Sequence, residues 1–155
     1  DGSARKEIRG FFGGDSRVHW LGEITAPEID VLHAAADLVV WPAVREAYGM
    51  ALLEAQAAGV PVIAGGAPGV RQIVAHGETG LIVPAESQTL ESQTLESQTL
   101  ESQTLETDMA QATATLLRDP DRRRAMGRAA LERARSRHDI ASAARHLSEI
   151  LETLT

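Results

Sequence analysis

The chain contains no cysteine, few aromatic residues and no long hydrophobic run. The lack of cysteine excludes disulfides and thiolate metal sites, and it fits a reducing compartment, so we expect a cytoplasmic location. Because only 3% of the residues are aromatic, the core must be built from Ala, Val, Leu and Ile. No apolar run approaches the roughly 18 residues that span a bilayer, and no secretory signal pattern opens the chain.

A length of 155 residues allows one domain with a real core and is too short for two ordinary ones. The net charge of −7 argues against nucleic-acid binding. Five of the glutamates lie in residues 86–106, so the rest of the chain is nearly neutral, which suits a protein that binds small anionic ligands. The arginine-rich residues 119–137 include Asp121 and Glu132 and no aromatics, so we interpret them as a solvated helix face.

Short apolar runs alternate with helical segments in the first half of the chain. The expected strands are residues 17–22, 38–41, 61–64 and 80–84. The expected helices are residues 27–36, capped near Thr25, then 49–58 and 69–76. Strands separated by short helices imply βαβ units. We therefore predict an α/β fold with a Rossmann-like parallel sheet and flanking helices.

The second half of the chain is predicted to be wholly helical. One apolar stripe has helical spacing and consists of Leu105, Met109, Ala112 and Leu116. Asp119 is expected to cap the next helix, with Pro120 in its first turn. A last helix is expected over residues 139–153. Its expected buried side is Ala143, Leu147, Ile150, Leu151 and Leu154.

Residues 86–105 repeat the pentapeptide ESQTL four times without change. A step of five residues turns a helix by about 500°, so the leucines spread around the axis and form no single seam. An exposed helical extension is marginal, and a pentapeptide solenoid is disfavoured because four copies would make about one coil. We interpret the repeat as a tandem duplication, natural or engineered, inserted at a tolerant surface loop of a single domain that spans residues 1–155.

The stretch REAYGMALLEAQ, residues 45–56, carries the candidate site. Ligands bind open α/β sheets at the carboxyl ends of the strands, where helix N-termini point, and Glu46 lies in such a loop. The amides of residues 49–51 are unsatisfied donors of the first helical turn and suit a phosphate. Gly49 permits close approach of a ligand, and the Glu54 carboxylate can accept two hydroxyl hydrogen bonds. The residues therefore favour a nucleotide sugar as the ligand.

A plainer interpretation of the same residues stays open at this point. Glu46 alone would be favoured near a helix start by the helix dipole, and Glu54 alone would be a solvent-facing helical residue. The GGAPG stretch at residues 65–69 is not a phosphate-binding P-loop, since no Lys-Ser or Lys-Thr follows it. We expect it to form a tight turn that opens the next helix.

Residues Glu46 and Glu54 form an E-x7-E spacing, and EAYG followed by LLEAQAAGVPVIA resembles the donor-binding segment of retaining glycosyltransferases of family 4. The segments DSRVHWLGEIT, LHAAADLVVW, GVRQIVAHGETGLIVPA and the helix that begins with Asp-Pro match the same family in order. The resemblance covers nearly the whole chain except the ESQTL insertion. It implies the carboxyl-terminal, donor-binding half of a two-domain GT-B fold.

The resemblance also implies roles for individual residues. Glu46 would be the catalytic residue beside the transferred hexose, and Glu54 would hold the nucleotide ribose. The backbone of Gly49, Met50 and Ala51 would meet the diphosphate, with Tyr48 contacting the substrate in the same segment. The family is generally independent of metals and cofactors, and the five histidines show no metal-ligand spacing. His19 and His33 are interpreted as packing or surface residues.

The chain departs from the family pattern in two ways. Pro68, Gly69 and Gln72 stand where the family commonly has a Gly-Gly pair followed by an acid. The upstream basic residues and the amino-terminal, acceptor-binding domain are not in the chain, so we expect this fragment alone to lack transferase activity.

Two other classes of function stay open. A non-catalytic scaffold or interaction domain could retain the fold, and a GT-B nucleotide-sugar epimerase would share it. The resemblance allows peripheral membrane association of the parent protein. Apolar residues of the last helix, among them Leu147, Leu151 and Leu154, would allow a homo-oligomer.

Overall fold

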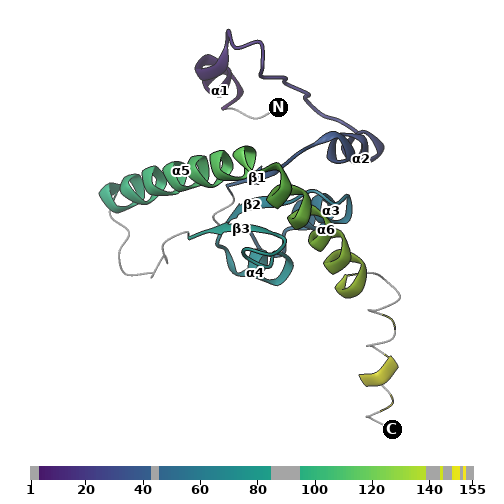
Figure 1. The fold of residues 1–155 in the computed structure, drawn as a ribbon. Coiled ribbons are helices and arrows are strands. Elements are labelled where there is room, and N and C mark those ends of the chain that lie inside the picture. Colours follow the sequence, from purple (N-terminus) through teal and green to yellow (C-terminus); the bar gives the residue numbers. More distant parts are fainter. Residues whose placement is uncertain are drawn as a thin grey trace.

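The computed structural model describes residues 4–42, 46–84 and 95–138, together with residues 144, 148–150 and 152. For residues 95–104 it describes the backbone alone. The elements in chain order are α1 (Arg5–Phe12), α2 (Ala26–Ala35), β1 (Val39–Trp41), α3 (Met50–Ala57), β2 (Val62–Gly65), α4 (Pro68–Ile73), β3 (Gly80–Val83), α5 (Leu95–Arg118) and α6 (Pro120–Arg137) (Figure 1).

The three strands form one parallel sheet in the order β1-β2-β3. Val39 of β1 is paired with Val62 of β2, and Val62 is paired in turn with Gly80 of β3. β2 is buried along its whole length because strands lie on both of its edges and helices cover both of its faces. The expected strands at residues 38–41, 61–64 and 80–84, and with them the α/β parallel-sheet fold, are confirmed.

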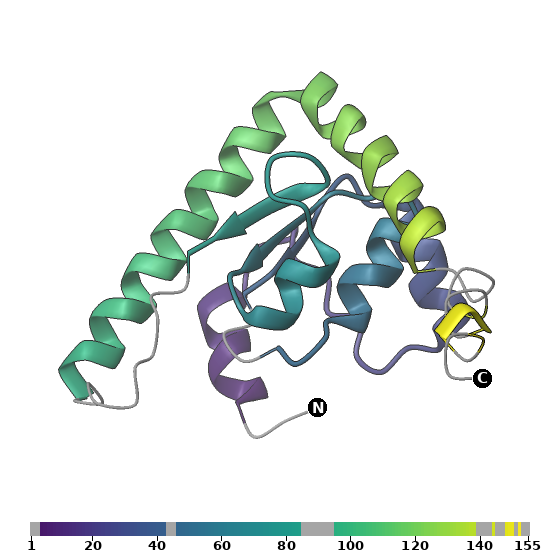
Figure 2. The same ribbon diagram turned by 90° about the horizontal axis from the view of Figure 1, so that it is seen from below.

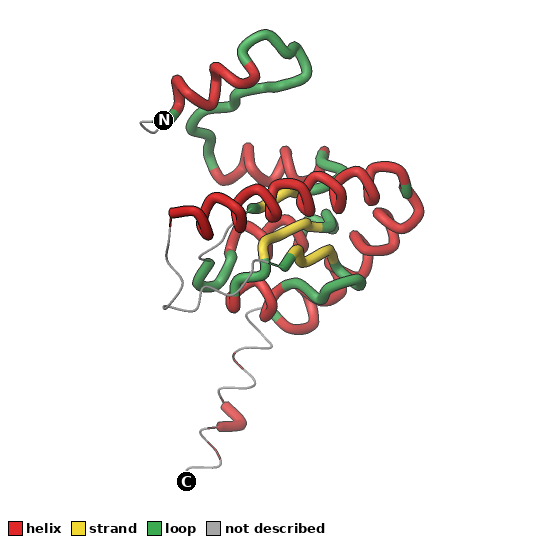
Figure 3. The backbone as a smooth tube through the Cα atoms, turned by 90° about the vertical axis from the view of Figure 1, so that its left-hand side faces the viewer, coloured by secondary structure: helices red, strands yellow, loops and turns green. Residues whose placement is uncertain are grey.

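The expected strand at residues 17–22 is wrong, because this stretch is irregular. A strand persists only when a neighbouring strand satisfies its backbone, and no strand of the described residues pairs with this one. The stretch contacts α1 instead: Trp20 packs on Phe12 with ring centroids 6.2 Å apart, and Arg9 lies over the Trp20 ring. Figure 3 shows that α1, which precedes this stretch in the chain, lies away from the sheet.

Two hydrophobic clusters fill the space on either side of the sheet. Strand side chains alternate between faces, so Val62 and Ala64 belong to one cluster and Ile63 to the other. α3 and α4 cover the first face, and α5 covers the second, as Figure 2 shows. On α5, Met109 and Leu116 are buried, while Leu105 and Ala112 pack partly buried against the same cluster. The apolar stripe predicted from the sequence is therefore confirmed.

The helix ends follow local signals in the sequence. The Thr25 amide and hydroxyl both donate to the Glu28 carboxylate at the start of α2, at 2.7 and 2.8 Å. α3 ends before Gly59, which has a φ of +78° that glycine adopts without strain. The Asp119 carboxylate accepts the Arg122 amide at 2.9 Å and caps α6, with Pro120 in the first turn, as expected.

The ESQTL repeat and the last predicted helix are described only in part. Residues 86–94 lie outside the described residues, and from Leu95 onward the backbone of the repeat is the start of α5. Of the apolar residues expected in the last helix, only Ile150 is described; Ala143, Leu147, Leu151 and Leu154 lie outside the described residues. Ile150 is 45% exposed and not buried. In Figure 1 the short helical segment at residues 148–150 lies away from the sheet.

Candidate functional site

The candidate site lies at the carboxyl edge of the parallel sheet. β1 ends at Trp41, and the chain reaches Glu46 before α3 begins. β2 ends at Gly65 and leads directly into α4 at the same edge. Parallel strands present their carboxyl ends together, so the starts of α3 and α4 are neighbours.

The Glu46 carboxylate is held by two donors. Its Oε1 accepts the Gly49 amide at 3.0 Å, and its Oε2 accepts the indole Nε1 of Trp41 at 3.2 Å. An ionised carboxylate has about four acceptor positions, and donors among the described residues occupy two of them, which leaves roughly two for a ligand. The half-buried Glu46 side chain is therefore fixed between β1 and the start of α3.

Gly49 is the N-cap of α3 and has a φ of +86°, in the left-handed region that favours glycine. A β-carbon here would also lie 3.2 Å from Leu52 Cδ1. The sequence predicted three open amides at residues 49–51. The Gly49 amide is occupied by Glu46, while no hydrogen bond within the described residues engages the amides of Met50 and Ala51. Two of the three predicted donors are thus without a partner in the part of the chain that the structure describes.

The other predicted site residues, Tyr48, Met50, Ala51 and Glu54, are exposed or half-buried at the start and along the length of α3. Tyr48 and Met50 are 41% and 54% exposed, and Ala51 is half-buried. Glu54 is exposed on α3, about 7.5 Å along the helix axis from Gly49 at about 1.5 Å per residue. The structure brings Glu46 and Gly49 together, and within the described part of the chain the Glu54 carboxylate makes no hydrogen bond.

Three further residues support this loop and were not predicted as site residues. Gly69, in the first turn of α4, lies so close to the Ala47 carbonyl that a β-carbon at this position would overlap it. Trp41 orients Glu46, and its only sequence signal is that it ends an apolar strand. His138 follows α6 and lies 3.4 Å from the Tyr48 hydroxyl through Nδ1, a contact that no local pattern predicts.

Burial lowers the pKa of His138, and the nearby positive charges of Arg133 and Arg137 lower it further. The ring is therefore neutral around pH 7. Its Nε2 atom is buried and has no hydrogen-bond partner among the described residues.

Gln72, which stands where the family commonly has an acid, is exposed at the end of α4. Its carbonyl accepts a hydrogen bond from Arg133 at 3.2 Å. No group of three or more His, Asp or Glu side chains among the described residues is arranged to hold a metal ion. Among the described helices, none combines the length and hydropathy that a membrane crossing requires.

Comparison with known proteins identifies relatives of this arrangement. The family model described as glycosyl transferases group 1 matches residues 6–113. A D-inositol 3-phosphate glycosyltransferase of Pseudarthrobacter chlorophenolicus is 37% identical over 122 residues, which is 79% of this chain and 25% of the relative. A GDP-mannose-dependent alpha-(1-6)-phosphatidylinositol monomannoside mannosyltransferase of Mycobacterium tuberculosis is 35% identical over 127 residues, covering 77% of this chain and 28% of the relative.

Solved structures with the same fold give a consistent result. Sucrose-phosphate synthase from Thermosynechococcus elongatus superposes with a TM-score of 0.76 and 27% identity, covering 99% of this chain and 35% of that one. Anabaena Alr3699/HepE in complex with UDP-glucose gives a TM-score of 0.68 at 27% identity, with 96% and 36% covered. The chain spans about a quarter to a third of the length of these relatives. By the extent of the family match, this chain belongs to the glycosyl transferases group 1 family.

Proposed function

We propose that residues 1–155 form a single, truncated nucleotide-sugar-binding domain of a retaining glycosyltransferase of family 4, with the ESQTL insertion at residues 86–105. The donor is a nucleotide diphosphate hexose. Its binding segment consists of the donor loop, residues 46–49, and the first turns of α3. In this proposal Glu46 contacts the transferred sugar, and Glu54 holds the ribose.

The single observation that carries the proposal is the orientation of the Glu46 carboxylate. Gly49 and Trp41 hold it beside the helix start at 3.0 and 3.2 Å, and the next two backbone amides have no hydrogen-bond partner among the described residues. A diphosphate on the Met50 and Ala51 amides would gain from the positive end of the helix dipole. A hexose attached to that diphosphate would then lie within reach of the two remaining acceptor positions of Glu46.

Glu54 is suited to bind the ribose, which lies on the other side of the diphosphate from the hexose. It is exposed on α3, and a carboxylate at this distance can accept both hydroxyls of a ribose while the diphosphate stays at the helix start. Tyr48 and Met50 are exposed beside these positions and would line the path between sugar and nucleotide.

The proposed chemistry is transfer of the hexose with retention at its anomeric carbon. The bond from the anomeric carbon to the diphosphate oxygen breaks, and the bond to the acceptor oxygen forms on the same face. The O–H bond of the acceptor hydroxyl breaks, and its proton passes to the leaving diphosphate. The helix start stabilises the charge of the leaving diphosphate, and Glu46 stabilises positive charge that develops on the sugar. The acceptor-binding domain lies in the remainder of the parent, so we expect this chain to bind a donor without transferring the sugar.

Two relatives suggest which donors to test. The Anabaena neighbour was solved with UDP-glucose, and the mycobacterial relative is named as GDP-mannose-dependent. We therefore infer a donor of the same chemical class, with either base and either hexose as candidates for this chain.

The test is a calorimetric titration of the chain with UDP, GDP, UDP-glucose and GDP-mannose. Glu54→Ala should weaken the binding of the nucleotide and of the nucleotide sugar by the same factor, since both ligands contain the ribose. Glu46→Ala should weaken the binding of the nucleotide sugar only. Glu132→Ala, an exposed glutamate of α6, is the matched control. Absence of binding at millimolar ligand by the wild-type chain would contradict the proposal and favour a scaffold role.

A further inference from the structure

The C-terminal end of α6 meets the donor loop through one side chain. His138 directly follows α6, and its Nδ1 lies 3.4 Å from the hydroxyl of Tyr48, ninety residues away in the sequence. We propose that His138 is a positioning residue that holds Tyr48, and through it the donor loop, in the arrangement that receives the nucleotide sugar. Its role in ligand binding depends on the proposed function, whereas its effect on the loop does not.

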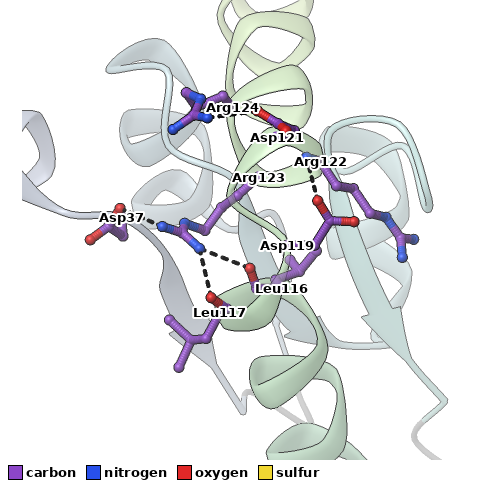
Figure 4. A network of polar contacts seen from close by, with 8 residues as sticks. All are labelled: Asp37, Leu116, Leu117, Asp119, Asp121, Arg122, Arg123 and Arg124. Carbon is purple, nitrogen blue, oxygen red and sulfur yellow. Dashed lines mark hydrogen bonds and ion pairs between the residues drawn. The ribbon is translucent and has the colours of Figure 1, made fainter.

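α6 can act as a rigid support because its first turn is fixed to two other elements. Arg123 donates to the Leu116 and Leu117 carbonyls at the end of α5, at 2.9 and 3.1 Å. The same guanidinium bonds the Asp37 carboxylate, just before β1, at 3.0 Å. Figure 4 shows these contacts converging on the start of α6.

The middle of α6 is fixed to the two helices that form the site. Gly127 packs so closely on the Gly59 carbonyl that a β-carbon would overlap it, which joins α6 to the end of α3. Arg133 donates to the Ile73 carbonyl at 2.9 Å and to the Gln72 carbonyl at 3.2 Å, which joins α6 to the end of α4. His138 therefore extends from a helix that is held at several points along its length.

The donor loop is held at three consecutive residues. Glu46 bonds the Gly49 amide, and Ala47 is in close contact with Gly69. The Tyr48 nitrogen also lies close to Gly69, but the Tyr48 side chain would otherwise be unsupported, since the residue is 41% exposed. The contact with His138 supplies the third point. It is also the only side-chain hydrogen bond of His138 among the described residues, and its loss would leave a partly buried ring with no polar partner.

The test measures hydrogen exchange of the Gly49 amide by NMR, together with UDP affinity, in the 155-residue chain. His138→Leu removes the ring nitrogens, and Tyr48→Phe removes only the hydroxyl. His138→Asn returns a polar group near the position of Nδ1. The control is His33→Leu. His33 is also half-buried and has a buried ring nitrogen with no partner among the described residues, but it lies on α2.

We expect His138→Leu and Tyr48→Phe each to speed Gly49 exchange and weaken UDP binding about threefold to tenfold, the range for one net hydrogen bond. The double variant should match either single variant, and His138→Asn should recover most of the loss. Unchanged Gly49 exchange in both single variants, or effects that add in the double variant, would overturn the inference. If the wild-type chain binds no UDP, the proposed function fails, while Gly49 exchange still decides the role of His138.

Discussion

Gly69→Ala tests how closely α4 must approach the donor loop. The added β-carbon would lie 2.7 Å from the Tyr48 nitrogen and would overlap the Ala47 carbonyl oxygen, although real β-carbons essentially never come within 3.0 Å of another atom. All of these neighbours are backbone atoms, so no flexible side chain can move aside. Either the first turn of α4 or the donor loop must shift by several tenths of an ångström.

The expected loss of stability follows from two opposing terms. Overpacking a well-filled site costs about 1–3 kcal/mol. Alanine is favoured over glycine inside a helix by up to about 1 kcal/mol. The net loss should therefore be about 1–2 kcal/mol, which moves a urea midpoint by on the order of 1 M for an m-value of about 1–3 kcal/mol/M.

Urea unfolding and UDP titration of Gly69→Ala measure both consequences. Gly10→Ala is the matched control, because Gly10 lies in α1 and a β-carbon there has nothing within 4 Å. The free energy of unfolding of this control should be unchanged or slightly higher than that of the wild-type chain. A Gly69→Ala chain with wild-type stability and wild-type UDP affinity would show that the approach of α4 to the loop is not needed.

Two further variants test contacts away from the donor loop, and a third tests the pH dependence that His138 gives to stability. Thr79→Val should lower the free energy of unfolding, measured with urea, by about 1–3 kcal/mol. The Thr79 hydroxyl accepts a hydrogen bond from the side-chain amide of the fully buried Gln56 at 3.1 Å, and a valine would leave that donor unpaired. Asp119→Ala should cost about 1 kcal/mol by thermal unfolding, since it removes the cap that accepts the Arg122 amide; an unchanged melting temperature would argue against the cap. Burial lowers the pKa of His138 from its ordinary 6.5, so the unfolded chain binds this proton more readily and stability should fall as the pH drops below 6.5. His138→Leu should make stability less dependent on pH in this range. If the variant and the wild-type chain show the same pH profile of stability, the role of His138 in that dependence is contradicted.

The sequence was sufficient for features that depend on local chemistry. α3 lies between two glycines with positive φ, Gly49 and Gly59, and both ends were predicted to within a residue. The spacing of Met109 and Leu116 correctly predicted which side of α5 is buried. In each case the information lies within one or two turns of the residue concerned.

Features that depend on distant partners could not be predicted. Residues 17–22 have the pattern of a strand, but a strand also needs a neighbour, which a local pattern does not contain. Glu46 was predicted as a site residue, yet its bond to Trp41 depends on how the loop folds back on β1. The contact between Tyr48 and His138 joins residues ninety positions apart, and neither carries a local signal for the other.

We propose that Glu46 and Glu54 flank a helix start that binds the diphosphate of an activated sugar. A crystal structure of the chain with UDP-glucose tests it most directly. We predict that the diphosphate accepts hydrogen bonds from the Met50 and Ala51 amides, with the glucose hydroxyls on Glu46 and the ribose on Glu54. A diphosphate bound anywhere else, or a ribose and glucose that touch neither carboxylate, would contradict the account.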